Sequence, residues 1–267
     1  MAMLSVQGLH KRYGTETVLG DISFTVEAGE FVSIVGPSGC GKTTMLRCIS
    51  GLMEHDGGTV EIAGQKVNGP PPTLGVVFQD YSRSLLPWLS VRQNVELPLR
   101  YRNLSKQERR DLTMESLKSV GLEKHVDKRP WQLSGGMQQR VAIARALAYQ
   151  PKLLLMDEPF ASVDAQTRTE LEDLMLSLWK EREMTIAFVT HDIDEAIYLG
   201  TRVLVLSRTP TRVDQVLPVD LPQPRSQVSS KGRPEFTRLR RVIFEGLGTA
   251  PAASFGTSEY VNATSIE

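Results

Sequence analysis

The sequence predicts an α/β fold in which helices cover both faces of a mostly parallel β-sheet. Short continuous apolar runs, typical of the central strands of such a sheet, alternate along the chain with segments of helical spacing. Polar residues that could carry chemistry follow directly after several of these runs. Because the carboxyl ends of parallel strands meet at one edge of a doubly wound sheet, the sequence predicts a ligand site along that edge.

One apolar run, residues 31–35, leads into a glycine-rich segment and then into a short helix. Residues 36–43 read GPSGCGKT and fit the pattern G-x-x-x-x-G-K-[ST]. Met45 and Ile49 give the next residues an apolar face at helical spacing, and Gly51 ends the helix. The pattern therefore lies between a strand and a helix, which is the context in which it binds phosphate.

The physical basis of this prediction is anion binding. Glycines let the backbone wrap closely, so that its N–H groups can point at phosphate oxygens, and the helix adds the positive end of its dipole. Lys42 can reach the β- and γ-phosphates, and the Thr43 hydroxyl can ligate Mg²⁺. A chance glycine-rich turn is the alternative, but it does not account for the flanking strand and helix. The residues predicted to bind the nucleotide here are Gly36, Pro37, Ser38, Gly39, Cys40, Gly41, Lys42, Thr43 and Thr44.

The composition is that of an ordinary globular protein and excludes several classes. Lys and Arg together number 31 and so do Asp and Glu, so no basic excess points to nucleic acid. No apolar run approaches the roughly 20 residues that span a bilayer. The first residues lack the apolar core of a secretory signal, and two cysteines are too few for a disulfide framework. We therefore expect a cytosolic protein.

The residues before the phosphate-binding segment predict an antiparallel β layer. Residues 4–9 and 18–27 alternate between apolar and polar side chains, with a predicted turn at 11–14 between them. A hairpin is predicted at 57–67. Tyr13 could stack on a nucleotide base, since aromatic faces are good platforms for purines, or it could be an ordinary half-buried tyrosine, and spacing does not decide between the two.

A helical insert is predicted at residues 85–150, between two regions of strands. Its start, residues 85–102, contains Pro87, Trp88 and Pro98, and any periodic pattern leaves its apolar residues exposed. Trp88 beside a proline could be core or an exposed anchor for a partner. A capping box at Ser105 begins the first clear helix.

A second candidate anion site lies near the end of this insert. Ser134 can cap a helix whose first turn contains Gly135 and Gly136. Glycines weaken a helix, so their presence there suggests close approach by another group. One chain rarely uses two such sites for one nucleotide, unless a second copy of the chain supplies one of them.

Paired acids follow the apolar run at residues 153–156. Asp157 stands where a Mg²⁺-binding carboxylate is expected across from the phosphate loop. The adjacent Glu158 would point differently and could polarise an attacking water. The alternative, an exposed acidic turn, is a poor match to four preceding apolar residues.

Two further strands are followed by polar side chains. Gln79 comes after the predicted strand at 74–78 and could hydrogen-bond a water or a metal-bound ligand, or simply cap a loop. His191 comes after the strand at 185–190, where a neutral imidazole could contact a γ-phosphate. A lone histidine often has only a structural role, but this one is predicted to lie on the same sheet edge as Asp157.

The last part of the chain predicts less regular structure. After the strand at 201–206, repeated prolines indicate a loop-rich edge. Residues 234–247 predict an amphipathic helix, and its three arginines favour packing on the core or on a partner over packing on a membrane. Residues 249–267 are small and polar and are predicted to be disordered.

Taken together, these segments resemble the ATP-binding subunit of ABC transporters over residues 3–225. The matching motifs, in the order and at the spacing of that family, are the Walker A loop at 36–43, the Q-loop at Gln79, the signature segment at 133–138, Walker B at 153–158, the D-loop at 162–164 and the switch histidine at His191.

The resemblance implies a fold and a domain organisation. It implies a P-loop NTPase core of the RecA-like type, formed by residues 1–84 and 151–225, with an antiparallel β subdomain. An α-helical signalling subdomain would occupy residues 85–150. Together these parts make an ABC ATPase domain at 1–225, followed at 226–267 by the amphipathic helix and tail.

Within the family, the chain looks most like the nitrate, sulfonate and taurine importer subgroup. The residues that carry this likeness are 85–91, 133–137 and 219–222. Met137 departs from the commoner glutamine at the end of the signature, although the departure is usual in this subgroup and Gln138 follows directly.

The resemblance also implies a role for each site residue. Tyr13 would stack on adenine, and Lys42 with the loop amides would hold the phosphates of ATP. Residues 134–136 would act in trans, on ATP held by a second copy in a head-to-tail homodimer.

Five residues would organise the reaction itself. Thr43, Gln79 and Asp157 would position Mg²⁺ and the attacking water, Glu158 would polarise that water, and His191 would steady the γ-phosphate.

The implied partners are membrane proteins rather than nucleic acid. They are two integral-membrane permease subunits and a periplasmic or extracytoplasmic solute-binding protein, so the chain would work at the cytoplasmic face of the inner membrane as a peripheral subunit. One alternative is an ABC ATPase that acts on nucleic acid or ribosomes, but the long coiled-coil insert or second cassette usual in those proteins is missing from this sequence. The other is a binding module without turnover, against which Lys42, Asp157 and Glu158 argue.

Overall fold

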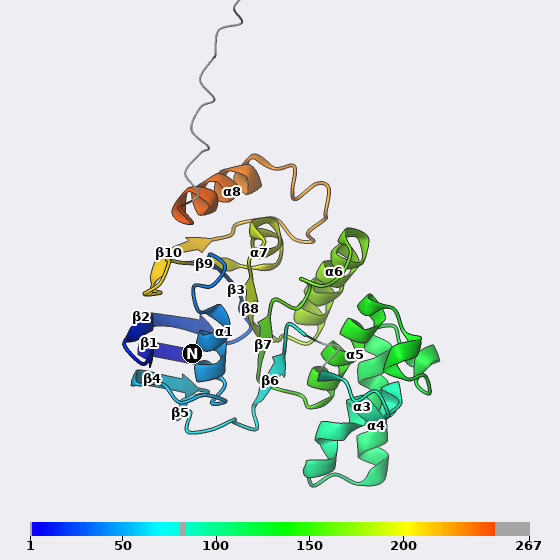
Figure 1. Ribbon diagram of the computed structural model, residues 1–267. Helices are drawn as coiled ribbons and strands as arrows, with labels where there is room; N and C mark the ends of the chain where they lie inside the picture. Colours follow the sequence, from blue (N-terminus) through cyan, green and yellow to red (C-terminus); the bar gives the residue numbers. More distant parts are fainter. Residues whose placement is uncertain (1, 81–83, 249–267) are drawn as a thin grey trace, which may run out of the picture.

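The computed structural model describes residues 2–80 and 84–248, and it consists of two sheets and a helical region (Figure 1). The strands are β1 (Ala2–Tyr13), β2 (Glu16–Glu27), β3 (Phe31–Val35), β4 (Gly57–Ile62), β5 (Gln65–Lys66), β6 (Leu74–Val77), β7 (Leu153–Asp157), β8 (Thr185–Thr190), β9 (Arg202–Leu206) and β10 (Val213–Pro218). The helices are α1 (Lys42–Ile49), α3 (Val91–Glu96), α4 (Lys106–Ser119), α5 (Gly135–Ala148), α6 (Ala165–Glu181), α7 (Ile193–Leu199) and α8 (Pro234–Gly246), with 3₁₀ turns η1 (Leu97–Tyr101), η2 (Glu123–His125) and η3 (Pro130–Gln132).

The larger sheet has the strand order β10-β9-β3-β8-β7-β6. All its neighbours pair in parallel except β10, which is antiparallel to β9 at the edge. The pairings Val35 with Thr190 and Asp157 with Val189 bring the carboxyl ends of β3, β7 and β8 to one edge. The predicted α/β class is therefore confirmed, and so is the prediction that the carboxyl ends of the parallel strands meet at one edge of the sheet.

Alternate residues of the central strands face two separate cores. In β3, Val32 and Ile34 pack with α1 and the four-stranded sheet, whereas Phe31 and Val35 pack with the helices on the other face. All five residues of this strand are buried, and burying an apolar side chain of this size contributes roughly 1.5–3 kcal/mol. This arrangement fixes α1, and with it the phosphate loop, between the two sheets.

The four-stranded antiparallel sheet has the order β2-β1-β4-β5, which confirms the predicted β layer. The predicted turn at 11–14 is wrong, because β1 continues to Tyr13 and pairs there with Glu16. The backbone N–H of Arg12 donates to Asp56 at 2.6 Å, which holds the end of the strand against its neighbour. Only Gly14 and the next residue form the turn.

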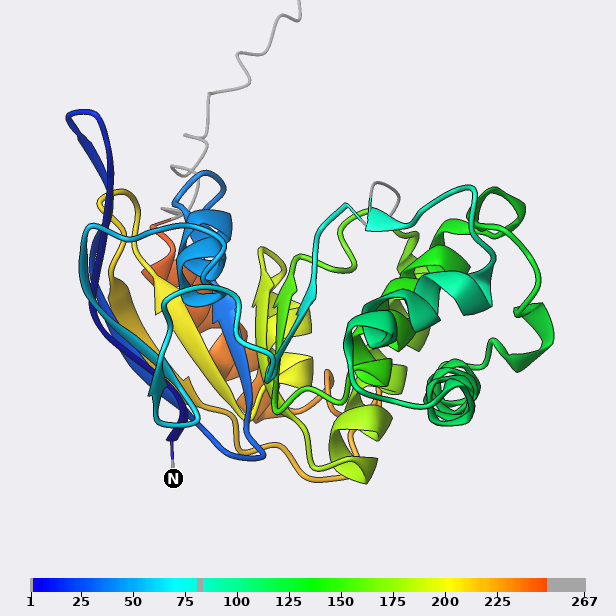
Figure 2. The same cartoon turned by 90° about the horizontal axis from the view of Figure 1, so that it is seen from below.

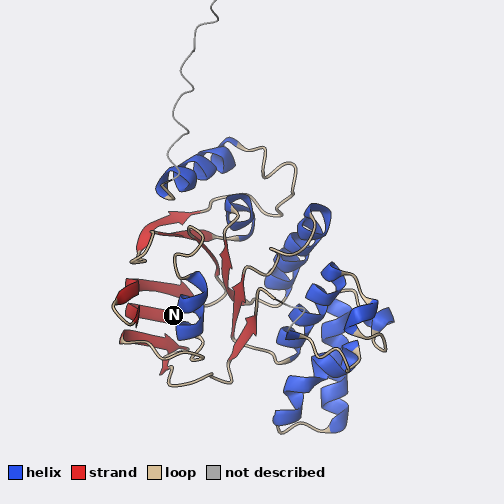
Figure 3. Ribbon diagram, in the orientation of Figure 1, coloured by secondary structure: helices blue, strands red, loops and turns tan. Residues whose placement is uncertain are grey.

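The helical region lies on the opposite side of the parallel sheet from the four-stranded sheet (Figures 2 and 3). The prediction that the apolar residues of 85–102 are exposed is wrong in part, because α3 buries Val91 and Val95. Ser90 and Gln93 form a capping box at its start, a sequence signal that indicates the helix. Trp88 is 65% exposed, so it is not part of the core.

The C-terminal part also differs from the loop-rich prediction. Strand β10 follows Thr209–Pro210 and extends the sheet by one edge strand, a position that tolerates a terminal proline. Helix α8 packs on the core through Phe236, Leu239 and Ile243, as the amphipathic pattern predicted. The tail predicted to be disordered, 249–267, lies outside the described residues. Within the residues that the structure describes, no helix combines the length and apolarity needed to cross a bilayer.

Candidate nucleotide-binding site

The phosphate loop joins β3 to α1 and depends on glycine at two positions. Gly39 and Gly41 have φ of 77° and 98°, a region that residues with a Cβ rarely adopt. A Cβ on Gly41 would lie 2.7 Å from Cγ1 of Val18, so the loop is also packed closely against β2. The helix starts at Lys42, directly after this turn, with Gly41 as its N-cap. The first N–H groups of α1 therefore belong to the loop that the sequence assigned to phosphate.

The Lys42 side chain is buried and points back into the loop. Its Nζ donates to the carbonyl oxygens of Gly36 and Pro37 at 2.9 and 3.0 Å. It also lies 3.4 Å from Oε1 of Glu158. A cation is thus held at the centre of the predicted phosphate site, where a nucleotide phosphate could replace part of these contacts.

Glu158 follows β7, and its carboxylate contacts side chains that follow the two neighbouring strands, β6 and β8. Its Oε2 lies 2.8 Å from Nδ1 of His191 and accepts a hydrogen bond from Nε2 of Gln79 at 3.4 Å. Its backbone has φ of 42°, which is unfavourable for a residue with a Cβ and costs on the order of 1 kcal/mol. A hydrogen bond of 2.8 Å from Glu158 N to the carbonyl of Val189 stabilises this turn. Because the backbone is left-handed at Glu158, its carboxylate points in a different direction from the carboxylate of Asp157.

Asp157 is 5% exposed and lies beside Thr43. Burial raises the pKa of Asp157, while a hydrogen bond with Thr43 opposes that rise. Its Oδ1 has no hydrogen-bond partner among the described residues, and a buried carboxylate oxygen normally has one. Thr43, Gln79 and Asp157 line one cleft, together with Arg47. Hydroxyl, amide and carboxylate oxygens are the ligands that Mg²⁺ prefers, so these residues fit that ion.

Tyr13 lies at the end of β1 and is 48% exposed. Its hydroxyl lies 3.2 Å from Sδ of Met53, and Nζ of Lys11 lies 5.9 Å from the ring centre. About half of the residue is therefore accessible, which is enough for the ring to stack on a base. These contacts are compatible with both roles that the sequence allows for Tyr13, a base platform or a half-buried tyrosine.

The second predicted anion site, residues 134–136, does not lie next to the phosphate loop within one chain. Ser134 caps α5 and accepts a hydrogen bond from the backbone N–H of Met137 at 3.4 Å. Both views place α5 across the parallel sheet from α1 (Figures 1 and 2). Gly136 lies against α6, where an added Cβ would come within 2.2 Å of Cγ2 of Thr167. Within one chain, residues 134–136 thus stand apart from the cluster around Lys42 and Glu158.

Sequence reasoning missed the residues behind His191. A small cavity is lined by Glu158 and His191 together with Arg168 and the buried Glu195. Asp192 caps α7 by accepting from the N–H groups of residues 194 and 195 at 2.9 and 3.1 Å. The short pattern of an aspartate followed three residues later by a glutamate could have indicated this cap, but no sequence signal links it to α6.

The chain is similar to known proteins along most of its length. A protein-family model described as ABC transporter matches residues 19–161, more than half of the chain. The chain belongs to the ABC transporter family. An ATP-binding protein of Brucella abortus is 44% identical over 244 residues, which cover 91% of this chain and 93% of that protein.

The chain is also similar to an import ATP-binding protein and to a solved ATP-binding cassette. The taurine import ATP-binding protein TauB of Escherichia coli K12 is 42% identical over 245 residues, 90% of this chain and 95% of TauB. Among solved structures, the dimeric ATP-binding cassette MJ0796 bound to ADP and Pi is 37% identical, with a TM-score of 0.71 over 81% of this chain and 99% of that one.

These findings confirm the family, the P-loop NTPase fold and the ATPase activity that the sequence predicted. The chain is an ATP-hydrolysing component of a transporter. The alternative of an ABC ATPase that acts on nucleic acid or ribosomes is not favoured.

Proposed function

We propose that this ATPase energises the import of a small anion of the nitrate, aliphatic sulfonate and taurine class. The observation that carries the proposal is the identity of 42% with TauB over nearly the whole of both chains. The subgroup likeness of residues 85–91 and 219–222 supports the same class. In this proposal, the membrane and solute-binding partners contact the solute and select it within that class.

In this proposal, Glu158 polarises the attacking water. Its carboxylate is oriented by the 2.8 Å contact with His191 and by the amide of Gln79. Lys42 exchanges its 3.4 Å contact with Glu158 for the β- and γ-phosphates, which frees the carboxylate for water. In the same proposal, His191 also contacts the γ-phosphate through a hydrogen bond.

The nucleotide is proposed to sit between Tyr13 at the base and the Gly36–Thr44 loop at the phosphates. We propose Mg²⁺ as the cofactor, held by Thr43, Gln79 and Asp157, where it would neutralise charge on the β- and γ-phosphate oxygens. The unpartnered Oδ1 of Asp157 supports this assignment.

A head-to-tail homodimer is proposed to complete each site. Residues 134–136 stand apart from Lys42 within one chain, so their capped helix N-terminus is available to the nucleotide of a second copy. The dimeric cassette MJ0796 supports such a pairing. We further propose two integral-membrane permease subunits and an extracytoplasmic solute-binding protein as partners, with this chain at the cytoplasmic face of the inner membrane.

Uptake in whole cells tests the substrate class. Cells of the source organism that lack this chain would be complemented with the wild type or with Glu158→Gln, and uptake of labelled taurine, an alkanesulfonate and nitrate would be measured. The proposal predicts that uptake of one of these solutes depends on the wild type and is lost with the variant. Unchanged uptake of all three would contradict the substrate class, while leaving the ATPase itself in place.

A further inference from the structure

The position of His191 depends on helix α7, which begins two residues after it. Asp192, between them, accepts from the first N–H groups of α7 and from Nη1 of Arg168 at 3.3 Å. Its own N–H donates to the hydroxyl of Thr190 at 3.0 Å. Hydrogen bonds therefore tie the turn that carries His191 to the start of α7.

The C-terminal residues hold α7 at both of its ends. Arg240 of α8 makes a bidentate ion pair with Asp194 in the first turn, with both N···O distances at 2.5 Å. Nη1 of Arg225 donates to the carbonyl of Tyr198 at 2.5 Å in the last turn. Carbonyls at the end of a helix lack intrahelical donors, so the arginine satisfies a group that would otherwise be unpaired.

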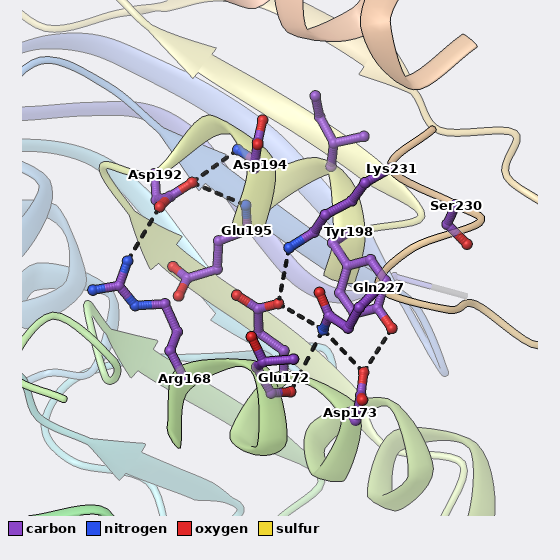
Figure 4. A network of polar contacts seen from close by, with 12 residues as sticks. Arg168, Glu172, Asp173, Asp192, Asp194, Glu195, Tyr198, Gln227, Ser230 and Lys231 are labelled. Atoms are coloured by element: carbon purple, nitrogen blue, oxygen red, sulfur yellow. Dashed lines mark hydrogen bonds and ion pairs between the residues drawn. The ribbon is translucent and has the colours of Figure 1, made fainter. Parts of the chain in front are cut away.

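Residues 225–231, here called the C-terminal strap, also tie α7 to α6 (Figure 4). Nε2 of Gln227 donates to Glu172 at 2.9 Å and to Asp173 at 3.0 Å, both on α6. The hydroxyl of Tyr198, on α7, donates to the same Asp173 oxygen at 2.6 Å. Nζ of Lys231 lies 3.4 Å from Glu172 and 5.0 Å from the centre of the Tyr198 ring. The strap thus contacts both helices with the same few side chains.

Glu172 needs these contacts because it is only 3% exposed. A buried carboxylate that loses its cation must take up a proton or move toward water. Its neighbour across the helix interface (Figure 4), Glu195 of α7, is also buried. Glu195 lines the same small cavity as Glu158 and His191. Displacement of Glu172 would therefore be transmitted through α7 to the catalytic turn.

We propose that the C-terminal strap is a positioning element for ATP hydrolysis, with Lys231 and Gln227 as positioning residues that hold α6 and α7 so that His191 meets Glu158. The inference rests on the proposed role of His191. It assigns to the segment beyond the nucleotide-binding core a direct part in the rate of the reaction, and not only in the stability of the fold.

The test compares Lys231→Met with Lys231→Arg in the full chain. Methionine keeps most of the length of the side chain and removes the charge, whereas arginine keeps both the charge and the stacking on Tyr198. We expect Lys231→Met to lower kcat about tenfold with KM for ATP unchanged, since a misplacement of about 1 Å can cost roughly 100-fold and a smaller shift costs less. Lys231→Arg should retain most of the activity. Lys180→Met, at an exposed position on the same helix as Glu172, is the matched control.

A double-mutant cycle with His191→Ala separates positioning from a general structural role. If Lys231 acts through the catalytic turn, Lys231→Met has no further effect on kcat in the His191→Ala background. An equal loss in both backgrounds, an unchanged kcat or a change in KM alone would overturn the inference. Gln227→Ala repeats the measurement through a different contact and decides the matter if Lys231→Met does not fold.

Failure of the strap's role and failure of the His191 role give different results. If His191→Ala alone leaves kcat unchanged, the proposed role of His191 is wrong and the strap has no route to the reaction. If His191→Ala lowers kcat while the strap variants behave as the wild type, only the inference about the strap is overturned.

Discussion

Replacing Glu195 with glutamine should change how the stability of the protein depends on pH. Glu195 is 4% exposed, and burial, followed by the nearby carboxylates of Glu172 and Asp192, raises its pKa from the ordinary value of 4.5 to about 8. A hydrogen bond with Thr190 and the charge of Arg168 oppose this rise. The folded protein therefore keeps a proton on Glu195 over a pH range in which the unfolded chain has released it.

The sign and size of the effect follow from that difference in bound protons. The contribution of Glu195 to the free energy of unfolding is complete below pH 4.5 and is lost as pH rises toward about 8. Each pH unit in this interval corresponds to about 1.4 kcal/mol, so the whole interval corresponds to roughly 5 kcal/mol at most. Glutamine is neutral at every pH and has no such loss.

The measurement is urea unfolding of wild type and Glu195→Gln at several pH values from about 5.5 to about 9. The difference in free energy of unfolding should grow by about 3 kcal/mol in favour of the variant between these limits. Taking the difference cancels the titration of groups that do not interact with Glu195, and Glu61→Gln, on the exposed side of β4, is the control. A difference that stays constant across this range would refute the argument that Glu195 is held neutral.

Two further predictions concern the nucleotide. Tyr13→Ala should raise the dissociation constant for ATP about tenfold, in keeping with the free energy of stacking a base on an aromatic ring, while Tyr13→Phe should leave it unchanged; equal affinities for all three proteins would exclude stacking. Gly136→Ala should lower kcat without weakening ATP binding to the monomer, because its Cβ would lie 2.2 Å from Cγ2 of Thr167 and would displace the start of α5. Thr167→Ser removes that methyl and should restore activity in the double variant, and a double variant as inactive as Gly136→Ala would show that the contact with Thr167 is not the cause.

Local sequence patterns were enough to predict the phosphate loop and the strands that carry the site. The spacing of the glycines, Lys42 and Thr43 predicts a strand, a loop and a helix together. The apolar segments before Asp157 and His191 are typical of strands in the centre of a parallel sheet. The predicted domain boundaries and the individual roles of the site residues stay predictions.

The contacts between distant segments could not be predicted in the same way. That Glu158 lies between Lys42 and His191 depends on the strand order β3-β8-β7, which no local pattern encodes. Helix α3 and strand β10 are short and lie beside prolines, so helical and strand periodicity are weak there. The strap meets α6 across a long stretch of intervening sequence, through polar side chains that alone predict only a solvated loop.

The most direct test of the central claim is the ATPase activity and oligomeric state of Glu158→Gln beside the wild type. We propose this carboxylate as the group that polarises water, because it lies 2.8 Å from His191 and 3.4 Å from Lys42, and the glutamine amide keeps its shape without its charge. The account predicts that the variant binds ATP in the presence of Mg²⁺, does not turn it over and accumulates as a dimer. Hydrolysis at the wild-type rate would contradict the role of Glu158, and a variant that stays monomeric with ATP bound would contradict a nucleotide site completed by residues 134–136 of a second copy.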